Sequence, residues 1–362
     1  MAEVKPFRAL RYSERAGSLA DLVAPPYDVI APAEREQYLS RSPHNVVHLT
    51  LPEFEEQAGR DFQAWQREGV LVDERPAAWA LSQDYVGPDG VARRRNGVVA
   101  AVRLEPYERR VVLPHERTHA APKEGRLRLL RATRAELEPI FCLHEGPSVE
   151  LPERTPDLEV DGARLWRLED DSALDGFAER QLLIADGHHR YETALTFHAE
   201  DGSEGSAYTM AALVSTAEQG LTIFPTHRIA RRFEADIAYG PDDPRLLLRE
   251  IEGRPTDRAA AVVATREGAA IVSGAGLDTE LVERLKPEQV SYTPSIDEAL
   301  AAVERGDAEA AFLLRPPALD RIWAIAKQGK TLPQKTTYFY PKLVSGLLFF
   351  PLAPPALLRS LE

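Results

Sequence analysis

Residues 181–195 read Gln-Leu-Leu-Ile-Ala-Asp-Gly-His-His-Arg-Tyr-Glu-Thr-Ala-Leu, an apolar run that ends abruptly in Asp-Gly-His-His-Arg. Residues 182–185 predict a short buried strand, and Gly187 permits a sharp turn that few other residues tolerate. The apolar residues over 191–195 recur with helical spacing. The stretch therefore predicts a strand, a tight turn and a helix in immediate succession.

Such a turn is suited to binding an anion. The first turn of a helix has N–H groups without an acceptor inside the helix, and their partial positive charge points toward the turn. His188, His189 and Arg190 add donors and positive charge. We expect a phosphate there, held by Gly187 and these three residues. A structural alternative stays open, in which Asp186 caps the helix and the histidines are solvated.

The composition is that of a globular protein with more than one domain. The chain has 362 residues, of which 44% are hydrophobic and 28% are charged, and this length exceeds the usual single core. We expect a mixed α/β (α+β) fold in three regions. These are residues 1–145 with antiparallel hairpins, 146–231 with the phosphate loop, and 232–362, an α/β portion that folds back on the site.

The charge balance argues against a nucleic-acid partner. The chain has 44 basic and 57 acidic residues, a net charge of −13, and no basic block offers a track for a phosphate backbone. The first residues lack the apolar core of a signal peptide, and no apolar run approaches membrane-spanning length. We therefore expect a cytoplasmic protein with no membrane partner. The sequence does not indicate the oligomeric state.

Several other segments have recognisable patterns. The only cysteine, Cys142, lies in an apolar run, so we expect a buried thiol and no thiol-rich metal site. Residues 24–30 predict a rigid Pro-Pro turn that presents Tyr27 and Asp28. Arg93-Arg94-Arg95 is interpreted as a solvated hairpin edge rather than a binding patch. The remaining patterns predict helices over 33–40, 59–69 and 295–302, and strands over 45–51, 77–86, 96–104, 208–214, 260–264 and 310–314.

Residues 115–119 read His-Glu-Arg-Thr-His, the spacing of a zinc-protease motif. That motif works because an uninterrupted helix places both histidines on one face. Pro114 before it and Pro122 after it argue against such a helix, and no third ligand follows at a recognisable spacing. We favour a polar loop that leads into a helix over 126–136. Four side chains of this segment are then available to a ligand: His115, Glu116, Thr118 and Lys123.

Two downstream segments add donors suited to oxyanions. Residues 225–228 read Pro-Thr-His-Arg, and residues 334–342 read Gln-Lys-Thr-Thr-Tyr-Phe-Tyr-Pro-Lys. Each alone would be an ordinary polar loop end. Together with the Gly187 turn they predict further phosphate-binding residues, namely Thr226, His227, Arg228, Lys335 and Thr337.

The Asp-Gly-His-His-Arg loop after an apolar strand resembles the signature loop of the ParB/sulfiredoxin-like superfamily, which includes ParB nucleotidases, sulfiredoxin and a free-serine kinase. The resemblance implies a ParB/sulfiredoxin-like phosphate-loop core that holds nucleotide phosphates.

The order of motifs along the chain is also similar to that of a prokaryotic family of unknown function, DUF family 1015. The motifs are Pro-Pro-Tyr-Asp-Val-Ile, His-Glu-Arg-Thr with Pro-Lys, the phosphate loop, Pro-Thr-His-Arg, and the segment over 334–342. The similarity runs from about Lys5 to Phe350 and points to serine metabolism. Members often read Pro-Lys-x-Asp-Arg-Leu where this chain has Gly125 in place of the Asp, which puts any catalytic role of that carboxylate in doubt here.

These patterns predict a phosphotransferase that uses ATP or ADP to phosphorylate a small hydroxylated metabolite such as free serine. Phosphoryl transfer needs mainly positioning and positive charge. The start of the helix is expected to bind the phosphates, and Arg190 with Lys123 or Lys335 is expected to neutralise their charge. Glu116 or Asp28, with His188 nearby, would activate the acceptor hydroxyl. Asp186 would hold Mg²⁺ through water.

Two other functions stay open at this point. One is a non-catalytic or slowly hydrolysing nucleotide-binding switch, which shares the phosphate site but predicts no turnover that depends on an acceptor. The other is a metal-dependent phosphoester hydrolase, because several histidines and carboxylates could gather a divalent ion.

Overall fold

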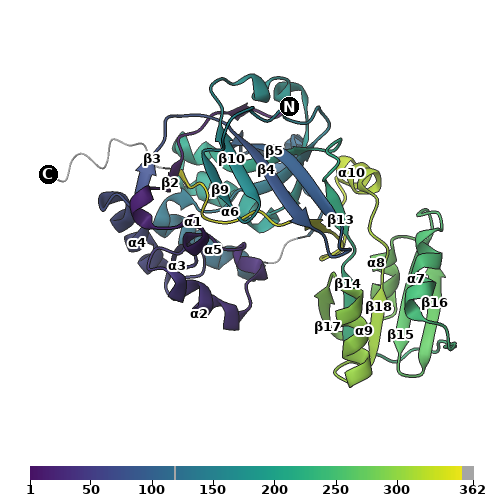
Figure 1. Cartoon of the computed structure of the whole chain (residues 1–362). Helices are drawn as coiled ribbons and strands as arrows, with labels where there is room; N and C mark the ends of the chain where they lie inside the picture. The colour runs from purple at the N-terminus through teal and green to yellow at the C-terminus, as the bar shows by residue number, and fades with distance from the viewer. Residues whose placement is uncertain (118–119, 353–362) are drawn as a thin grey trace.

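The computed structural model describes residues 1–117 and 120–352 and has a mixed α/β architecture, which confirms the expected class. Figure 1 shows a large body built on one sheet, with a smaller sheet standing beside it. The large sheet has nine strands: β1 (Val4–Lys5), β4 (Trp79–Val86), β5 (Ala92–Arg103), β6 (Val112–Leu113), β8 (Ile140–His144), β9 (Leu158–Val160), β10 (Ala163–Arg167), β11 (Leu182–Asp186) and β12 (Tyr208–Ser215).

The large sheet mixes parallel and antiparallel pairs. Its order is β6-β11-β8-β12-β5-β4-β10-β9, with β1 paired to β5. β8 is parallel to β12 and antiparallel to β11, and β11 is parallel to β6. Every residue of β8 and β12 is buried, as continuous apolar runs at the centre of a sheet should be. The thiol of Cys142 in β8 is buried as expected.

Helices cover the large sheet. α4 (Glu55–Arg67), α5 (Ala120–Thr133) and α6 (His188–Asp201) pack against one another in that order. Shorter elements complete the body: α1 (Leu19–Leu22), α2 (Pro32–Arg41), α3 (Val47–Thr50), a hairpin of β2 (Leu10–Tyr12) with β3 (Leu71–Asp73), and 3₁₀ turns η1 (Glu14–Ala16), η2 (Tyr27–Val29), η3 (Tyr107–Arg109), η4 (Ser172–Leu174), η5 (Phe177–Glu179) and η6 (Gly205–Ala207). Among the described residues, no helix is long and apolar enough to cross a membrane.

Two predicted elements differ from the structure. Residues 45–51 are not a strand: α3 forms there, because the Asn45 side chain accepts a hydrogen bond from Val47 N at 3.0 Å and starts a helical turn. The helix predicted over 126–136 begins earlier and ends earlier. Pro122 falls in its first turn, where the missing N–H would have no acceptor in any case. Residues 135–136 then leave the helix as β7 (Ala135–Glu136).

The smaller sheet is antiparallel and five-stranded. Its order is β16 (Gly268–Gly274), β15 (Ala259–Thr265), β18 (Ala310–Leu313), β14 (His227–Arg232) and β17 (Glu288–Thr293). α7 (Pro244–Glu252) and α9 (Ile296–Arg305) pack on one face, and α8 (Asp278–Arg284) packs on the other. The expected cap of α9 is confirmed, because Ser295 Oγ accepts from Glu298 N at 3.2 Å.

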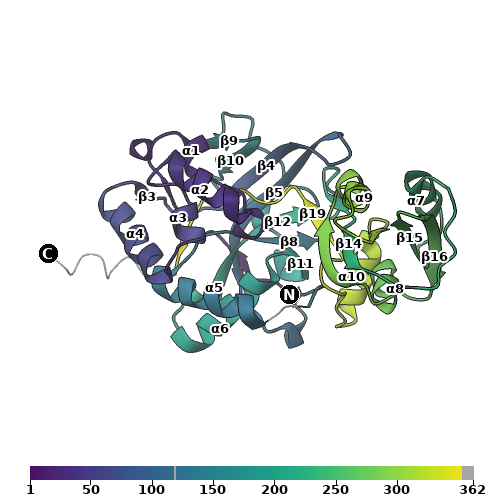
Figure 2. The same cartoon turned by 90° about the horizontal axis from the view of Figure 1, so that it is seen from below.

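The C-terminal segment returns to the large body. After α10 (Leu319–Lys327), β19 (Tyr338–Tyr340) pairs with β13 (Thr222–Phe224), and β20 (Phe350–Pro351) pairs with β7. Phe339 packs on Phe141 and Leu183, so β19 lies against β8 and β11, as Figure 2 shows. This return brings residues near position 340 next to the end of β11.

Glu136 of β7 is a buried carboxyl group whose ionisation opposes folding. It accepts hydrogen bonds from Met210 N at 2.5 Å and from Thr209 Oγ1 at 2.9 Å. Burial raises its pKa to about 7, and these two hydrogen bonds offset only part of that rise. The pKa of Glu136 in the folded protein lies above its unfolded value of 4.5. The protonated carboxyl group therefore contributes its full stability below pH 4.5, and this stability is lost as the pH rises through 7.

We therefore expect the free energy of unfolding of Glu136→Gln to increase relative to that of the wild type as the pH rises, because glutamine keeps an acceptor but cannot ionise. Between pH 5.5 and 8 the difference in unfolding free energy should shift by about 2 kcal/mol in favour of the variant. Urea unfolding at the two pH values measures this shift. Glu200→Gln, at an exposed position, is the matched control and should show no such change. A difference between Glu136→Gln and wild type that does not depend on pH would contradict the assignment.

Candidate functional site

The strand, turn and helix predicted around Gly187 are confirmed. β11 ends at Asp186, Gly187 adopts φ +94°, and α6 begins at His188. A residue with a Cβ would be strained at this φ. The first hydrogen bond of the helix runs from Tyr191 N to Gly187 O at 3.0 Å, so the N–H groups before Tyr191 have no acceptor inside the helix. The positive end of α6 therefore faces out of the turn.

The turn opens into a cleft of about 590 Å³, a volume typical of small-molecule sites. One wall comes from the small sheet, at the junction of β17 with α9 over residues 291–294, and another comes from the returning C-terminal segment. Ten of the residues predicted for the site line this cleft: Asp28, Glu116, Asp186, Gly187, His188, His189, Arg190, Thr226, Lys335 and Thr337.

Asp186 lies between two cations. Its Oδ2 accepts from Arg190 Nη2 at 2.9 Å, and its Oδ1 pairs with Lys342 Nζ. Burial alone would raise the pKa of Asp186, but Lys342 and Arg190 outweigh it and hold that pKa well below its usual value. The group is thus an ionised carboxylate with a net positive surrounding. Lys342 was not predicted from the sequence as a site residue. The only indication of its role was its position at the end of the segment over 334–342.

The Arg190 guanidinium lies against the Gly187 turn. A Cβ built on Gly187 would stand 3.1 Å from Arg190 Nη2. Besides Asp186, the guanidinium donates to Pro139 O, so two of its five N–H groups have described partners. Its carboxylate partner is therefore Asp186, and the remaining donors are placed close to the turn.

A chain of hydrogen bonds joins two buried histidines. His115 Nδ1 lies 2.6 Å from Ile184 O, and its Nε2 lies 2.8 Å from Thr337 Oγ1. Because a carbonyl only accepts, Nδ1 carries the proton and Nε2 accepts from Thr337. His115 N in turn donates to His188 Nε2 at 3.2 Å.

Both imidazoles are neutral. Burial lowers the pKa of His115 to about 4, and it holds the pKa of His188 well below its ordinary value, with His115 adding to that effect. His188 therefore does not bring to the cleft the positive charge that the sequence suggested. His115 is fully buried and positions Thr337 instead of facing a ligand.

Glu116 and Lys335 form the other chemical pair of the cleft. Burial raises the pKa of Glu116, and the Lys335 backbone N–H and ammonium only partly counter it. Lys335 has φ +54°, in the left-handed region. No described residue forms a hydrogen bond or ion pair with its ammonium group. The cleft thus contains a proton-accepting carboxyl group beside an uncommitted cation.

Three predicted site residues do not line the cleft. Lys123 pairs with Glu192 on α6. His227 faces the core of the small sheet, where its Nδ1 accepts from Leu314 N at 3.1 Å. Arg228 is buried and donates to Thr226 O at 2.7 Å. His227 and Arg228 support the wall of the cleft, because their ring and guanidinium nitrogens bind backbone groups of Leu314, Thr226 and Lys335.

Arg95 differs from the sequence interpretation. Arg93 and Arg94 pair with surface aspartates as expected of a solvated edge. Arg95 is only 1% exposed and stacks over Phe141 at 4.4 Å. Its guanidinium donates to Tyr340 O at 3.2 Å and to Pro341 O at 2.7 Å. It therefore fixes the segment that carries Lys342, and its role is one of positioning.

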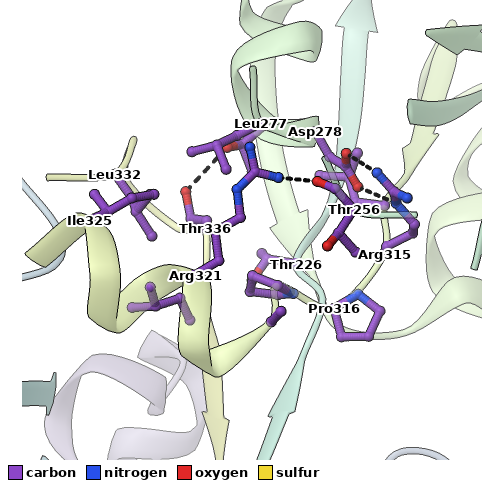
Figure 3. A pocket seen from close by; sticks show the side chains of 15 residues that line it. Thr226, Thr256, Leu277, Asp278, Arg315, Pro316, Arg321, Ile325, Leu332 and Thr336 are labelled. Atoms are coloured by element: carbon purple, nitrogen blue, oxygen red, sulfur yellow. Dashed lines mark hydrogen bonds and ion pairs between the residues drawn. The ribbon is translucent and has the colours of Figure 1, made fainter. Parts of the chain in front are cut away.

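A smaller pocket next to the cleft is too small for a nucleotide or a metabolite. Its volume is about 40 Å³, and Figure 3 shows that it lies among α10 and the first residues of α8. Its charged groups already have partners: Arg315 Nη2 pairs with Asp278 at 2.7 Å, and Arg321 Nη2 donates to the backbone carbonyl of Gly276 at 3.2 Å. Room for a water or two indicates a structural role at this junction.

The residues described here contain no group of three or more His, Cys, Asp or Glu side chains arranged to hold a metal ion. Thr118 and His119, which end the His-Glu-Arg-Thr-His motif, lie outside the described residues. Both oxygens of Asp186 already accept from cations, so Mg²⁺ held there through water would lie close to the positive charges of Lys342 and Arg190. That part of the prediction stays a prediction.

Comparisons with known proteins give one family and several distant structures. The chain is similar to a conserved hypothetical protein from Pyrococcus furiosus, with 14% identity, TM-score 0.39, and coverage of 69% of this chain and 95% of that one. It is similar to a free serine kinase in complex with AMP, with 14% identity, TM-score 0.40, and coverage of 69% and 92%. No curated protein matches. Residues 4–238 match the model of a family described as "Protein of unknown function (DUF1015)", a match that spans the Gly187 turn.

Proposed function

The chain belongs to the DUF1015 family of proteins of unknown function, and from its cleft we propose that it is a nucleotide-dependent phosphotransferase that phosphorylates a small hydroxylated metabolite, such as free serine. One arrangement supports this proposal most strongly. A single cleft combines the start of a helix, suited to an anion, and a lysine without a side-chain hydrogen-bond partner among the described residues with a half-buried carboxyl group whose pKa is raised. These are the parts that phosphoryl transfer requires.

The phosphates of ATP or ADP are proposed to bind at the Gly187 turn. The free N–H groups of the helix start suit phosphate oxygens. Arg190 and Lys342 flank the turn and share one carboxylate, Asp186, and Lys335 adds a third cation to the same cleft. The Asp-Gly-His-His-Arg loop also resembles loops that hold nucleotide phosphates. This side of the cleft thus provides the electrostatic stabilisation.

The carboxylate of Glu116 is proposed to activate the acceptor. It takes the proton of the acceptor hydroxyl while the hydroxyl oxygen forms a bond to the terminal phosphorus. The bond from that phosphorus to the bridging oxygen breaks, and the nucleotide leaves with one phosphate fewer. A raised pKa suits this role, because the best general base titrates near the working pH. Asp28, exposed at the edge of the cleft, is the alternative base.

Transfer is tested directly with the full chain, ATP or ADP, Mg²⁺ and serine, with the phosphorylated product detected by mass spectrometry. We expect O-phosphoserine, or the phosphate ester of another hydroxylated metabolite in a wider panel. If neither nucleotide transfers phosphate to any member of the panel, the proposed reaction is wrong.

One observation favours a second candidate, a nucleotide-binding switch. Asp186 links Arg190 of α6 to Lys342 of the returning segment. A phosphate at the turn would compete with Asp186 for both cations, so that binding loosens the link between these two elements. Calorimetry separates the candidates: a switch binds nucleotide tightly, and no small hydroxylated metabolite changes that nucleotide.

Arg190→Ala should weaken nucleotide binding about ten- to a hundredfold, because it removes a charge-assisted contact worth about 1.5–3 kcal/mol. Arg190→Lys should recover only part of this loss, since an ammonium group lacks the planar fork of donors. Calorimetric titration of the folded variants measures the affinity. A lower melting temperature with unchanged affinity would mean that Arg190 only anchors Asp186 and Pro139.

A further inference from the structure

A second cavity, larger than the cleft, lies on the large sheet. Its volume is about 740 Å³, and it shares no lining residue with the cleft. Val98 of β5 and Leu213 of β12 contribute to its floor. The chain between the end of β8 and the start of β11 covers it, with η4 and η5 forming part of the wall. None of its lining residues has a part in the proposed reaction.

A buried histidine in its wall has an unused ring nitrogen. His144 is 4% exposed and lines the cavity. Its Nδ1 is buried without a hydrogen-bond partner among the described residues. The ring is held edge to face by Phe177, with 4.8 Å between the ring centres. Buried polar atoms are nearly always hydrogen-bonded, so His144 is a polar group of the cavity wall whose hydrogen bonds within the described residues are incomplete.

An arginine without a carboxylate partner lies next to His144. Arg180 stacks over Phe177 at 5.1 Å, and no described acidic residue forms an ion pair with it. Two glycines make room for its guanidinium. A Cβ on Gly146 would lie 2.6 Å from it, and a Cβ on Gly176 would lie 2.8 Å from it. The neighbouring Arg154, by contrast, is already paired with Asp157 at 2.8 Å.

The rim of the cavity has the opposite charge. Arg180 is partly buried, whereas the acidic residues of the lining are exposed: Glu150, Glu153, Glu169, Asp170 and Asp175. A simple anion would be repelled at this rim, and a simple amine would leave Arg180 unpaired. A ligand with both a carboxylate and an amine satisfies both parts of the cavity.

We propose that this cavity is a second binding site, for a small zwitterion of the amino-acid class, whose carboxylate pairs with Arg180 and accepts a hydrogen bond from His144 while its amine faces the acidic rim. The site is independent of the nucleotide cleft and does not depend on the reaction proposed there. Its floor strands β5 and β12 belong to the sheet that also carries β11.

Calorimetry with the full chain tests the site. The probes are the common amino acids without a side-chain hydroxyl and glycylglycine, with propionate and ethylamine as ligands that have only one of the two charges. We expect at least one zwitterion to bind, and both single-charge probes to bind at least about tenfold more weakly. No binding by any zwitterion, or equal binding by propionate or ethylamine, would overturn the proposal.

Two variants locate the binding. Arg180→Gln should weaken it about ten- to a hundredfold, and Gly146→Ala should weaken it by crowding the guanidinium rather than removing it. Lys335→Met, in the nucleotide cleft, is the matched control and should leave zwitterion binding unchanged. If Lys335→Met abolishes binding while Arg180→Gln does not, the ligand sits in the cleft and the second site is wrong. Circular dichroism verifies that each variant is folded.

Discussion

Asp186→Asn is expected to lower the unfolding free energy by about 3–5 kcal/mol, because it leaves two buried cations without their shared counter-charge. Lys342 and Arg190 have 16% and 15% of their side chains exposed, so water compensates little for the loss. Asparagine keeps the shape of the side chain, so the change isolates charge from packing. Urea unfolding at pH 7 measures the loss.

A paired substitution tests the cause. Asp186→Asn combined with Lys342→Met should recover part of the stability, since one of the two uncompensated charges is then gone. Asp28→Asn, at an exposed carboxylate of the same cleft, is the matched control and should change the free energy of unfolding only slightly. If Asp186→Asn is as mild as Asp28→Asn, the three charges do not hold the turn together.

Glu116→Gln is expected to reduce phosphoryl transfer about 10²- to 10⁴-fold, the usual contribution of a general base. The amide cannot take the proton of the acceptor hydroxyl, yet it keeps the size of the side chain. Nucleotide affinity should change much less than transfer, because Glu116 is proposed to contact the acceptor hydroxyl and not the phosphates. Single-turnover kinetics and calorimetry on the same preparation separate these two effects.

Asp28→Asn distinguishes the two candidate bases. It should leave transfer within a few-fold of the wild type if Glu116 is the base. If Asp28→Asn reduces the rate of transfer strongly and Glu116→Gln reduces it only slightly, Asp28 is the base and Glu116 is not. A loss of nucleotide binding in Glu116→Gln would show that this residue belongs to the phosphate side instead.

The strand, turn and helix around Gly187 could be predicted from the sequence because each part has a local cause. The apolar run forms the strand, the glycine permits φ +94°, and the helix follows from its spacing. The α3 segment had no comparable local signal. Its seven residues fit strand alternation, and packing around Asn45 decided otherwise.

Residues of the site that depend on long-range contacts were harder to predict. Lys342 is a site residue only because the chain returns to pair it with Asp186, 156 positions earlier. The same return turns Arg95 from an apparent surface residue into a buried support. His227 and Arg228 stand beside Thr226 in the sequence, but the fold uses the side chain of His227 to bind Leu314 N and that of Arg228 to bind backbone carbonyls of the cleft wall.

The charge state of the histidines also followed from the fold rather than from the sequence. A pair of histidines beside an arginine suggests positive charge when only the sequence is known. In the structure, burial and the contact between His115 and His188 keep both rings neutral. Positive charge in the cleft therefore comes from Arg190, Lys335, Lys342 and the start of α6.

The most direct test of the phosphate site is a calorimetric comparison of ADP with adenosine, on the wild type and on Lys335→Met. If phosphate groups bind at the Gly187 turn, the wild type should bind ADP at least about ten- to a hundredfold more tightly than adenosine. Lys335→Met should lower the ratio of ADP affinity to adenosine affinity, and a rise in salt concentration should lower it as well. Equal affinity for ADP and adenosine, or no binding of ADP, would contradict the phosphate site on which the proposed function rests.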